Sequence, residues 1–264
     1  MKYRIIKKSL IGILFLTLLF WMNATTAQSQ SMPVEQNIDS IKIEPGAPIK
    51  YQHFGNGKRM RRIPGGVRVY CLLGRDKNNF TVLVPENNPV LTTVEGPKLF
   101  FYIPKTAKTT VQGFEFFVKD AAQKVIYQQK YKVNQQPGIF SIDIPADKNQ
   151  PLLEAGQEYH WYLGVICQPQ DRARDQVVGG TIKQIVPDKE LTNKLKKASP
   201  RERAALYATS GIWYDSLAIL AQLRRQRPND AALQTDWQSL LESVKLANIV
   251  PEPLVGELEV DTTK

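Results

Sequence analysis

Two carboxylates stand close together in residues 168–175, which read QPQDRARD and follow an aromatic, apolar run. A pair of carboxyl groups facing each other across a cleft can supply the acid and the base that hydrolyse a glycan. Asp171 and Asp175 are therefore the candidates for such chemistry. The simpler interpretation is a solvated turn, because Pro169 ends the preceding strand and turns commonly carry charged residues.

The sequence gives little support for a metal site, a catalytic serine nucleophile or a phosphate-binding loop. The chain has two histidines, His53 and His160, and neither has a partner at the spacing of metal ligands. No Gly-x-Ser-x-Gly turn is present. In the segment GNGKRMRRIPGGVR, Arg59 follows Lys58 where a phosphate-binding loop has Ser or Thr. We therefore predict no cofactor and no metal.

The same segment carries a group of positive charges, at Lys58, Arg59, Arg61 and Arg62. It lacks the interleaved aromatic residues that stack on bases, so nucleic acid is not expected as a partner. The main interpretation is a solvated flank of the first strand. The alternative is a patch that binds an anionic polysaccharide or a protein of the cell envelope.

The first residues have the pattern of a secretory signal peptide. A basic head, MKYRIIKK, precedes the apolar run SLIGILFLTLLFW and a polar stretch with small residues. The apolar run is shorter than the roughly 20 residues that span a bilayer. We therefore predict that residues 1–27 are a cleaved signal and that the protein is exported, periplasmic or extracellular, with no transmembrane segment after cleavage. Retention as an anchor is the alternative. Residues 28–61 are predicted to be a flexible polar tail.

The two cysteines are predicted to pair. Cys71 and Cys167 are the only cysteines of the chain, and thiols of exported proteins usually form disulfides in an oxidising compartment. Closing a loop of about 100 residues would restrict the unfolded chain by roughly 4 to 5 kcal/mol. Two buried, unpaired thiols are the alternative.

Residues 62–186 have the texture of short strands separated by turns. Apolar and polar residues alternate in several runs, for example GIFSIDIP at 138–145, which is typical of a sheet with one face on a core. No helical period intervenes, so we predict an antiparallel β-sandwich of the immunoglobulin or fibronectin type. Tyr159 has the position of a tyrosine corner, whose phenol bonds a backbone group upstream. An ordinary buried tyrosine is the alternative. Tyr159 and Trp161 are predicted core anchors.

After Pro187 the apolar period becomes helical. Ser199, Pro200 and Glu202 give the start signal of a helix with a capping box. A partial match to a tetratricopeptide hairpin follows, at Ala204, Tyr207, Gly211, Leu220 and Pro228. We therefore predict a helical hairpin with a capping helix within residues 187–254 and a tail at 255–264. Trp213 and Trp237 are the predicted core anchors of this region.

Asp215 follows two aromatic residues at the start of a predicted helix. It lies about 200° around that helix from Trp213, so both cannot share one apolar seam. Because an unpaired buried carboxylate is costly, Asp215 should face solvent or be held by a cation such as Arg172 or Arg203. We favour the second alternative, an interdomain latch between the hairpin and residues 168–175. Its predicted members are Asp171, Arg172, Asp175, Arg203 and Asp215.

Several motifs together resemble a known family. They are PGG at 64–66 with Arg68 and Cys71, LTT at 91–93, FFYIP at 100–104, PGI at 137–139, YHWY at 159–162, CQPQDR at 167–172, and ERAALY at 202–207 leading to GIWYD at 211–215. Residues 62–254 are similar to a cyanobacterial group of exported proteins known as domain of unknown function 928. The resemblance implies an envelope protein with both cysteines and implies no known activity. Gln168 stands where that family usually has aspartate.

These observations favour a non-catalytic binding or scaffold protein of the cell envelope. The alternative is a hydrolase that acts on envelope glycans through Asp171 or Asp175. The position of these two carboxylates distinguishes the hypotheses, because a hydrolase needs them to open onto a concave pocket. Charges paired on an exposed loop would favour binding.

Overall fold

The computed structural model describes residues 46–54, 62, 80–86, 89–104, 111–133, 136–146 and 151–262. The chain divides into two compact units, residues 1–36 and 37–264, and every described residue belongs to the second. The predicted signal segment and Cys71 lie outside the described residues, so cleavage and the Cys71–Cys167 bond stay predictions. No helix in the described ranges is long and apolar enough to cross a membrane.

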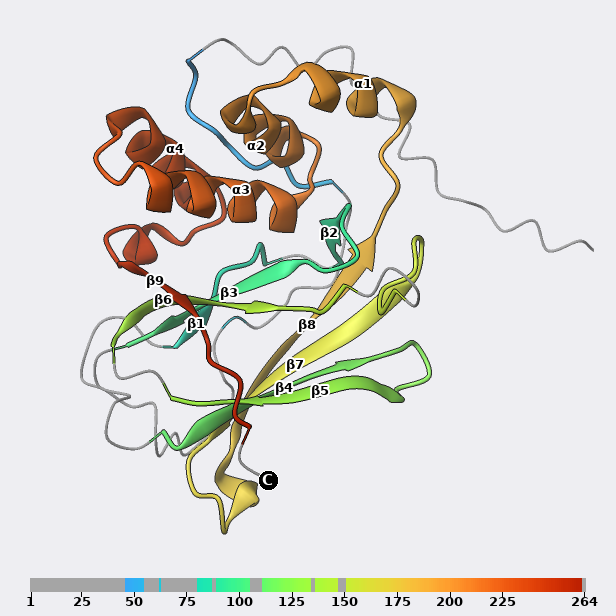
Figure 1. The fold of residues 1–264 in the computed structure, drawn as a ribbon, viewed down its shortest axis with the longest axis vertical. Coiled ribbons are helices and arrows are strands. Elements are labelled where there is room, and N and C mark those ends of the chain that lie inside the picture. The colour runs from blue at the N-terminus through green and yellow to red at the C-terminus, as the bar shows by residue number, and fades with distance from the viewer. Residues whose placement is uncertain are drawn as a thin grey trace, which may run out of the picture. The chain divides into compact units, whose positions relative to one another are not determined.

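The strands form two sheets (Figure 1). Along the chain, β1 to β8 come first, α1 to α4 follow, and β9 comes after the helices. The four-stranded sheet has the order β1-β3-β6-β9, with β1 at Thr81–Val82, β3 at Lys98–Ile103, β6 at Gly138–Asp143 and β9 at Leu254–Glu257. The five-stranded sheet has the order β2-β8-β7-β4-β5, with β2 at Val90–Thr92, β8 at Gln176–Gln184, β7 at Glu158–Ile166, β4 at Gly113–Lys119 and β5 at Val125–Tyr131.

The prediction of purely antiparallel sheets is wrong, because each sheet contains one parallel pair. Strand β2 pairs in parallel with β8, and β9 pairs in parallel with β6. Residues 255–264 are not a tail as predicted, because β9 returns after the helices and adds an edge to the first sheet. Beyond it, Val260 forms an antiparallel bridge with Tyr131 of β5. The local period of apolar residues predicts which face of a strand is buried, but it does not predict which strand pairs with which.

Strand β6 is buried on both faces, unlike the one-sided strand that its alternation predicts. Figure 1 shows the helices on one side of the four-stranded sheet and most of the five-stranded sheet on the other. One hydrophobic core runs through both interfaces. Between the sheets, Phe101 of β3 meets Trp161 of β7 edge to face, with ring centroids 6.0 Å apart. A sheet covered on both sides needs apolar residues on both faces.

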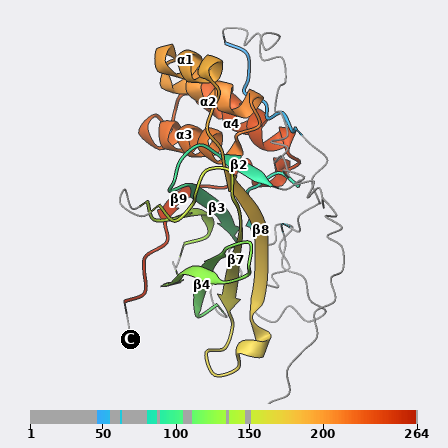
Figure 2. The same cartoon turned by 90° about the vertical axis from the view of Figure 1, so that its right-hand side faces the viewer.

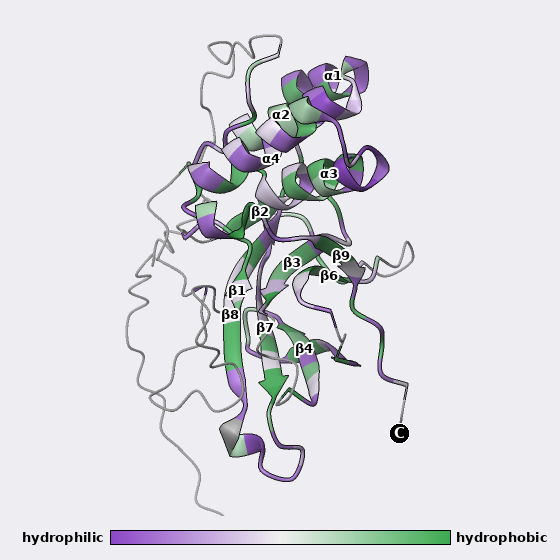
Figure 3. Ribbon diagram, turned by 90° about the vertical axis from the view of Figure 1, so that its left-hand side faces the viewer, coloured by the Kyte–Doolittle hydropathy of each residue, from purple (hydrophilic) through white to green (hydrophobic). Residues whose placement is uncertain are grey.

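The described part of the chain forms four α-helices, α1 (Lys189–Lys197), α2 (Pro200–Thr209), α3 (Trp213–Gln226) and α4 (Ala231–Ser243). The predicted capping box is confirmed: Ser199 accepts from the backbone N–H of Glu202, and the Glu202 carboxylate accepts from the Ser199 N–H at 2.7 Å. Gly211 turns the chain between α2 and α3 at φ +71°, a conformation that favours glycine. In Figure 3, α1 is mostly hydrophilic, whereas β7 and β8 carry long hydrophobic stretches.

Residues 46–54 dock on the helices. The N–H of Ile49 donates to Asp236 of α4 at 3.3 Å, and the N–H of Gln52 donates to the Ala208 carbonyl of α2 at 3.0 Å. Ile49 is buried in the common core. This part of the predicted tail therefore covers the helical layer.

Candidate functional site

Residues 168–175 fold into a short turn, η3 (Arg172–Arg174), between β7 and β8. Arg172 donates to Asp175 and to Glu115 of β4, each at 2.5 Å. Burial raises the pKa of Glu115, but hydrogen bonds from Arg172 and Gln128 outweigh it, and the net shift is downward. The Asp171 N–H donates to the Gln168 carbonyl at 3.0 Å, which closes the turn. The cluster thus ties its loop to the sheet.

The predicted latch is wrong, because the turn and the helices lie at opposite ends of the long strand pair. The start of β7 and the end of β8 lie next to β2, which contacts α3. The turn η3 joins the other ends of β7 and β8, a full strand length away (Figure 2). Asp215 therefore meets neither Asp171, Arg172 nor Asp175, and no bond joins it to Arg203, which is exposed.

Asp215 is held by neutral donors instead of a cation. Its carboxylate accepts from the Thr92 hydroxyl at 2.7 Å, from the Thr93 N–H at 3.1 Å and from the Thr93 hydroxyl. The side chain is only 6% exposed. Burial raises the pKa of Asp215, and the threonine hydrogen bonds offset only part of that shift. The expectation that this carboxylate faces solvent or a cation is therefore corrected.

The two aromatic residues before Asp215 fix the same junction between α3 and the sheets. Trp213 donates its indole N–H to the Leu83 carbonyl at 2.8 Å, and Tyr214 accepts from the indole of Trp161 at 3.1 Å. Both side chains are buried, because β2, α2 and residues 46–54 cover α3 from several directions. The predicted anchors Tyr159, Trp161, Trp213 and Trp237 are all buried. These groups hold the fold together.

The basic segment is described at Arg62 only. Its side chain is 9% exposed and lies 3.9 Å from Glu86. Burial lowers the pKa of Arg62 to about 10, and Glu86 opposes the shift. Arg62 therefore cannot belong to an open patch, while Lys58, Arg59 and Arg61 lie outside the described residues and their partners stay predictions.

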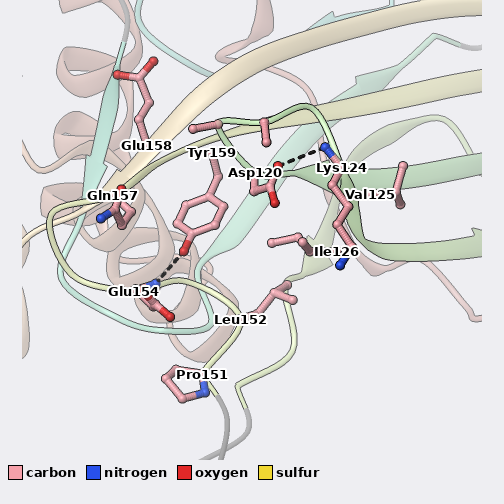
Figure 4. A pocket seen from close by; sticks show the side chains of 12 residues that line it. Asp120, Lys124, Val125, Ile126, Pro151, Leu152, Glu154, Gln157, Glu158 and Tyr159 are labelled. Carbon is pink, nitrogen blue, oxygen red and sulfur yellow. Dashed lines mark hydrogen bonds between the residues drawn. The ribbon is translucent and has the colours of Figure 1, made fainter. Parts of the chain in front are cut away.

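A cleft of about 800 Å³ opens where the β4–β5 turn faces the loop before β7 (Figure 4). It is lined by Asp120, Ala121, Ala122, Lys124, Val125, Ile126, Pro151, Leu152, Glu154, Gln157, Glu158 and Tyr159. Of these residues only Tyr159 was singled out from the sequence, as a core anchor. The others come from two turns that are distant in the chain.

Backbone bonds shape both walls of the cleft. Asp120 accepts from the Lys124 N–H at 2.9 Å, which fixes the β4–β5 turn. Tyr159 accepts with its phenol oxygen from the Glu154 N–H at 3.1 Å, the upstream bond predicted for it. In Figure 4 the Tyr159 ring stands between the two turns, with Glu158 on its far side from Lys124.

The cleft combines an apolar floor with an excess of negative charge. Val125, 45% exposed, and Ile126 and Leu152, both half-buried, supply apolar surface. Three acidic residues, Asp120, Glu154 and Glu158, are among the residues that line the space, with one lysine, Lys124, and in Figure 4 the Glu158 carboxylate points away from it. In the described part of the chain, no ion pair engages Glu154 or Glu158. No group of three or more His, Cys, Asp or Glu side chains within the described ranges is arranged to hold a metal ion.

A family model described as Domain of Unknown Function (DUF928) matches residues 63–254. The chain belongs to the DUF928 family. The matched region contains β1 to β8 and α1 to α4 and ends at the first residue of β9. No curated protein matches the chain.

Three of the DUF928-like motifs meet at the α3 junction. Thr92 and Thr93 come from LTT, Trp161 from YHWY, and Tyr214 and Asp215 from GIWYD. Their side chains bond one another across elements that are far apart in the chain. These residues of the family motifs therefore form hydrogen bonds that attach α3 to the sheets.

Proposed function

We propose that this protein is a non-catalytic binding or scaffold module of the cell envelope whose partner enters the cleft beside β5. The observation that carries the proposal is the lining of the cleft, where apolar residues stand next to three acidic residues and one lysine. Apolar surface removed from water contributes about 25 cal/mol per Å². Fixed charges add selectivity for a partner of opposite sign.

A partner with positive charge fits this lining. The chain as a whole has a net charge of +10, so the local excess of acid runs against the average of the molecule. Among the described residues that line the cleft, Lys124 is the only cationic one. A Lys or Arg side chain with its apolar stem matches both features, because the stem covers apolar surface while the head pairs with carboxylates.

The alternative of a glycan hydrolase needs Asp171 or Asp175 at a concave surface. Neither residue lines the cleft, and Asp175 forms an ion pair with Arg172. These positions give more support to binding than to hydrolysis. The envelope location rests on the predicted signal segment at residues 1–27.

Likeness of architecture also supports a binding role. We propose that the paired sheets are of the immunoglobulin or fibronectin type and that α2 and α3 form a tetratricopeptide-like hairpin. The Tyr159 phenol bonded to Glu154 five residues upstream and the α2–α3 turn at Gly211 favour these assignments. Both architectures commonly present binding surfaces.

The proposal can be tested by titrating the protein with blocked arginine amide and measuring the shifts of its NMR signals. Signals of Tyr159 and Ile126 should shift with arginine amide and not with the neutral glutamine amide. The double variant Glu154→Gln, Glu158→Gln should lose the response, and the matched control Glu95→Gln, an exposed carboxylate outside the cleft, should keep it. Equal shifts with both amides, or none with either, would refute a cleft selective for positive charge.

A further inference from the structure

The face of the five-stranded sheet that points away from the core carries a row of residues in register across four strands. Phe117 of β4 lies opposite Gln128 of β5 on one side and Tyr162 of β7 on the other, and Tyr162 lies opposite Gly179 of β8. Trp161, the neighbour of Tyr162 along β7, is buried between the two sheets. Because successive side chains of a strand point to opposite faces, Phe117 and Tyr162 belong to the outer face.

Two aromatic rings form the centre of this row. The ring centroids of Phe117 and Tyr162 are 5.9 Å apart, and the ring planes are tilted by 39°. Both side chains are half-buried, so each ring keeps part of its surface in solvent. A Cβ atom on Gly179 would lie 2.7 Å from Cδ1 of Tyr162, so the glycine leaves the space in which that ring lies against the sheet. We call Phe117 and Tyr162 the aromatic platform.

Gly164 of β7 leaves a place beside the platform without a side chain. It lies opposite Glu115, two residues from Tyr162 and on the same face. Among the described atoms beyond its chain neighbours, a Cβ on Gly164 would meet only the Glu115 carbonyl oxygen, at the ordinary distance of 3.6 Å, and its φ is not positive. Neither crowding nor backbone conformation therefore requires glycine here, although glycine weakens the interior of a strand. Such a glycine marks a place where a ligand approaches the backbone closely.

Two lysines place positive charge on either side of the platform. The Lys119 ammonium nitrogen lies 5.3 Å from the centre of the Tyr162 ring. Lys130 of β5 stands opposite Glu115, whose carboxylate is already paired with Arg172. Within the described ranges, no ion pair engages Lys119 or Lys130. The two positions lie four residues apart along β4, about 14 Å in an antiparallel strand, so the face is complementary to an extended anion.

The position of the platform in the sheet indicates the chemistry of its ligand. Strands β4, β7 and β8 are interior strands of the order β2-β8-β7-β4-β5 and lie side by side in Figure 2. Their backbone groups pair within the sheet, so recognition on this face depends on side chains and not on strand addition. A pyranose ring presents a face of C–H groups that can cover an aromatic ring, while its hydroxyls remain free for polar groups. A sugar that also carries a carboxylate matches the lysines.

We infer that this outer face binds an extended polysaccharide that carries carboxylate groups. One sugar ring covers the aromatic platform, the sugar chain passes over Gly164, and its carboxylates pair with Lys119 and Lys130. The flexible four-carbon stem of Lys119 lets its ammonium group turn from the Tyr162 ring toward an anion. None of these residues lines the cleft. The site is therefore additional to the proposed cleft, and it selects a ligand of opposite charge.

Calorimetry of the full chain with a hexamer of galacturonic acid at low salt tests the inference. The hexamer should bind several-fold more tightly than its fully methyl-esterified form, because esterification removes the charges. Tyr162→Ala should lower the affinity by about tenfold, and Tyr162→Phe, which keeps the ring, should retain it. Lys119→Gln with Lys130→Gln should abolish the preference for the acid. The matched control, Lys196→Gln with Lys197→Gln, changes two exposed lysines of α1 and should preserve it.

Variants of Gly164 separate a binding role from a structural one. The Cβ of Gly164→Ala has room at the sheet, so thermal unfolding should show no loss of stability. The same variant should bind the hexamer several-fold more weakly, and Gly164→Val should bind it more weakly still, because the added groups occupy the place of the sugar chain. Unchanged affinity in a folded Gly164→Val variant would overturn the inference.

The remaining outcomes each overturn the inference in a distinguishable way. Equal affinity for the acid and its ester would refute recognition of carboxylates. A hexamer of glutamic acid that binds as tightly as the galacturonate would assign the face to an acidic protein. Loss of binding in Glu154→Gln with Glu158→Gln, but not in Tyr162→Ala, would move the ligand to the cleft. Absence of binding would refute the site on the outer face, while titration with arginine amide would still decide the cleft separately.

Discussion

Asp215 of α3 and Thr92 of β2 share a hydrogen bond of 2.7 Å across a separation of 123 residues. Strand β2 is only three residues long and joins its sheet through parallel pairing with β8. The carboxylate therefore fastens the first turn of a helix to the edge of the five-stranded sheet. Together with the bond between Trp161 and Tyr214, it makes the helices and sheets parts of one core.

Replacement of Asp215 by Asn should lower the free energy of unfolding by about 1–3 kcal/mol at neutral pH. One carboxylate oxygen is replaced by an amide NH₂ that faces the donors of Thr92 and Thr93, so buried donors lose their acceptor. Urea denaturation measures the effect. Glu95→Gln, an exposed control, should stay within about 0.5 kcal/mol of the unmodified protein. Equal stabilities of the two variants would contradict the junction described here.

The stability difference between the unmodified protein and Asp215→Asn should depend on pH. Burial raises the pKa of Asp215, so the folded state holds this proton more tightly than the unfolded state. Its stabilising contribution is therefore complete below about pH 3.9, the pKa of an unfolded aspartate, and falls as pH rises through the folded-state pKa. Denaturation across this range should show the difference shrinking. If the stability difference instead grew with pH, the hydrogen bonds from Thr92 and Thr93 would outweigh the effect of burial on the pKa of Asp215.

The contribution of Arg172 to stability should be coupled energetically to that of Glu115 and not to that of Asp215. Double-mutant cycles with Arg172→Ala, Glu115→Gln and Asp215→Asn measure this, because residues in contact give non-additive losses of about 0.5 kcal/mol or more. The Arg172–Glu115 pair at 2.5 Å predicts such coupling. Additive losses are expected for Arg172 with Asp215. Coupling between these two would restore the latch predicted from the sequence.

Trp213 should tolerate Phe far better than Ala. The alanine variant opens a cavity in the core and should cost about 3–5 kcal/mol. The phenylalanine variant keeps most of the volume but leaves the Leu83 carbonyl without its donor, which costs about 1–3 kcal/mol. Thermal and urea unfolding would rank the variants. A phenylalanine variant as unstable as the alanine variant would show that packing volume alone does not explain this site.

Cys71 and Cys167 should give no free thiol when the denatured, unreduced protein is titrated from its native compartment. The expectation rests on export and on the presence of only two cysteines. Reduction should then lower stability by roughly 4 to 5 kcal/mol, if strain is small. Two free thiols per chain would end this prediction.

Local signals predicted the helical region well, because its determinants lie within a few residues of one another. The capping box at Ser199 and the turn at Gly211 need only near neighbours. The partner of Asp215 could not be found in this way. Helical geometry correctly placed Asp215 off the Trp213 seam, but the donors that satisfy it lie in β2, whose position depends on pairing with β8.

The cleft was missed for a related reason. Its walls are the β4–β5 turn and the loop before β7, and each alone reads as an ordinary polar connection. They meet because β4 and β7 pair antiparallel, with Lys119 opposite His160. The charged cluster at 168–175, which is evident in the sequence, lies at the other ends of β7 and β8, away from the cleft. A search for carboxylates at the ends of paired strands would have found both places.

Binding of blocked arginine amide to three forms of the protein, measured by calorimetry at low salt, tests the central claim most directly. The forms are the unmodified protein, Glu154→Gln with Glu158→Gln, and Asp171→Asn with Asp175→Asn. The account predicts affinity for the first and third forms and a loss of about tenfold or more in the second, equal to about 1.4 kcal/mol. Loss of binding in the third form with full affinity in the second would place the site at the charged turn and contradict the account.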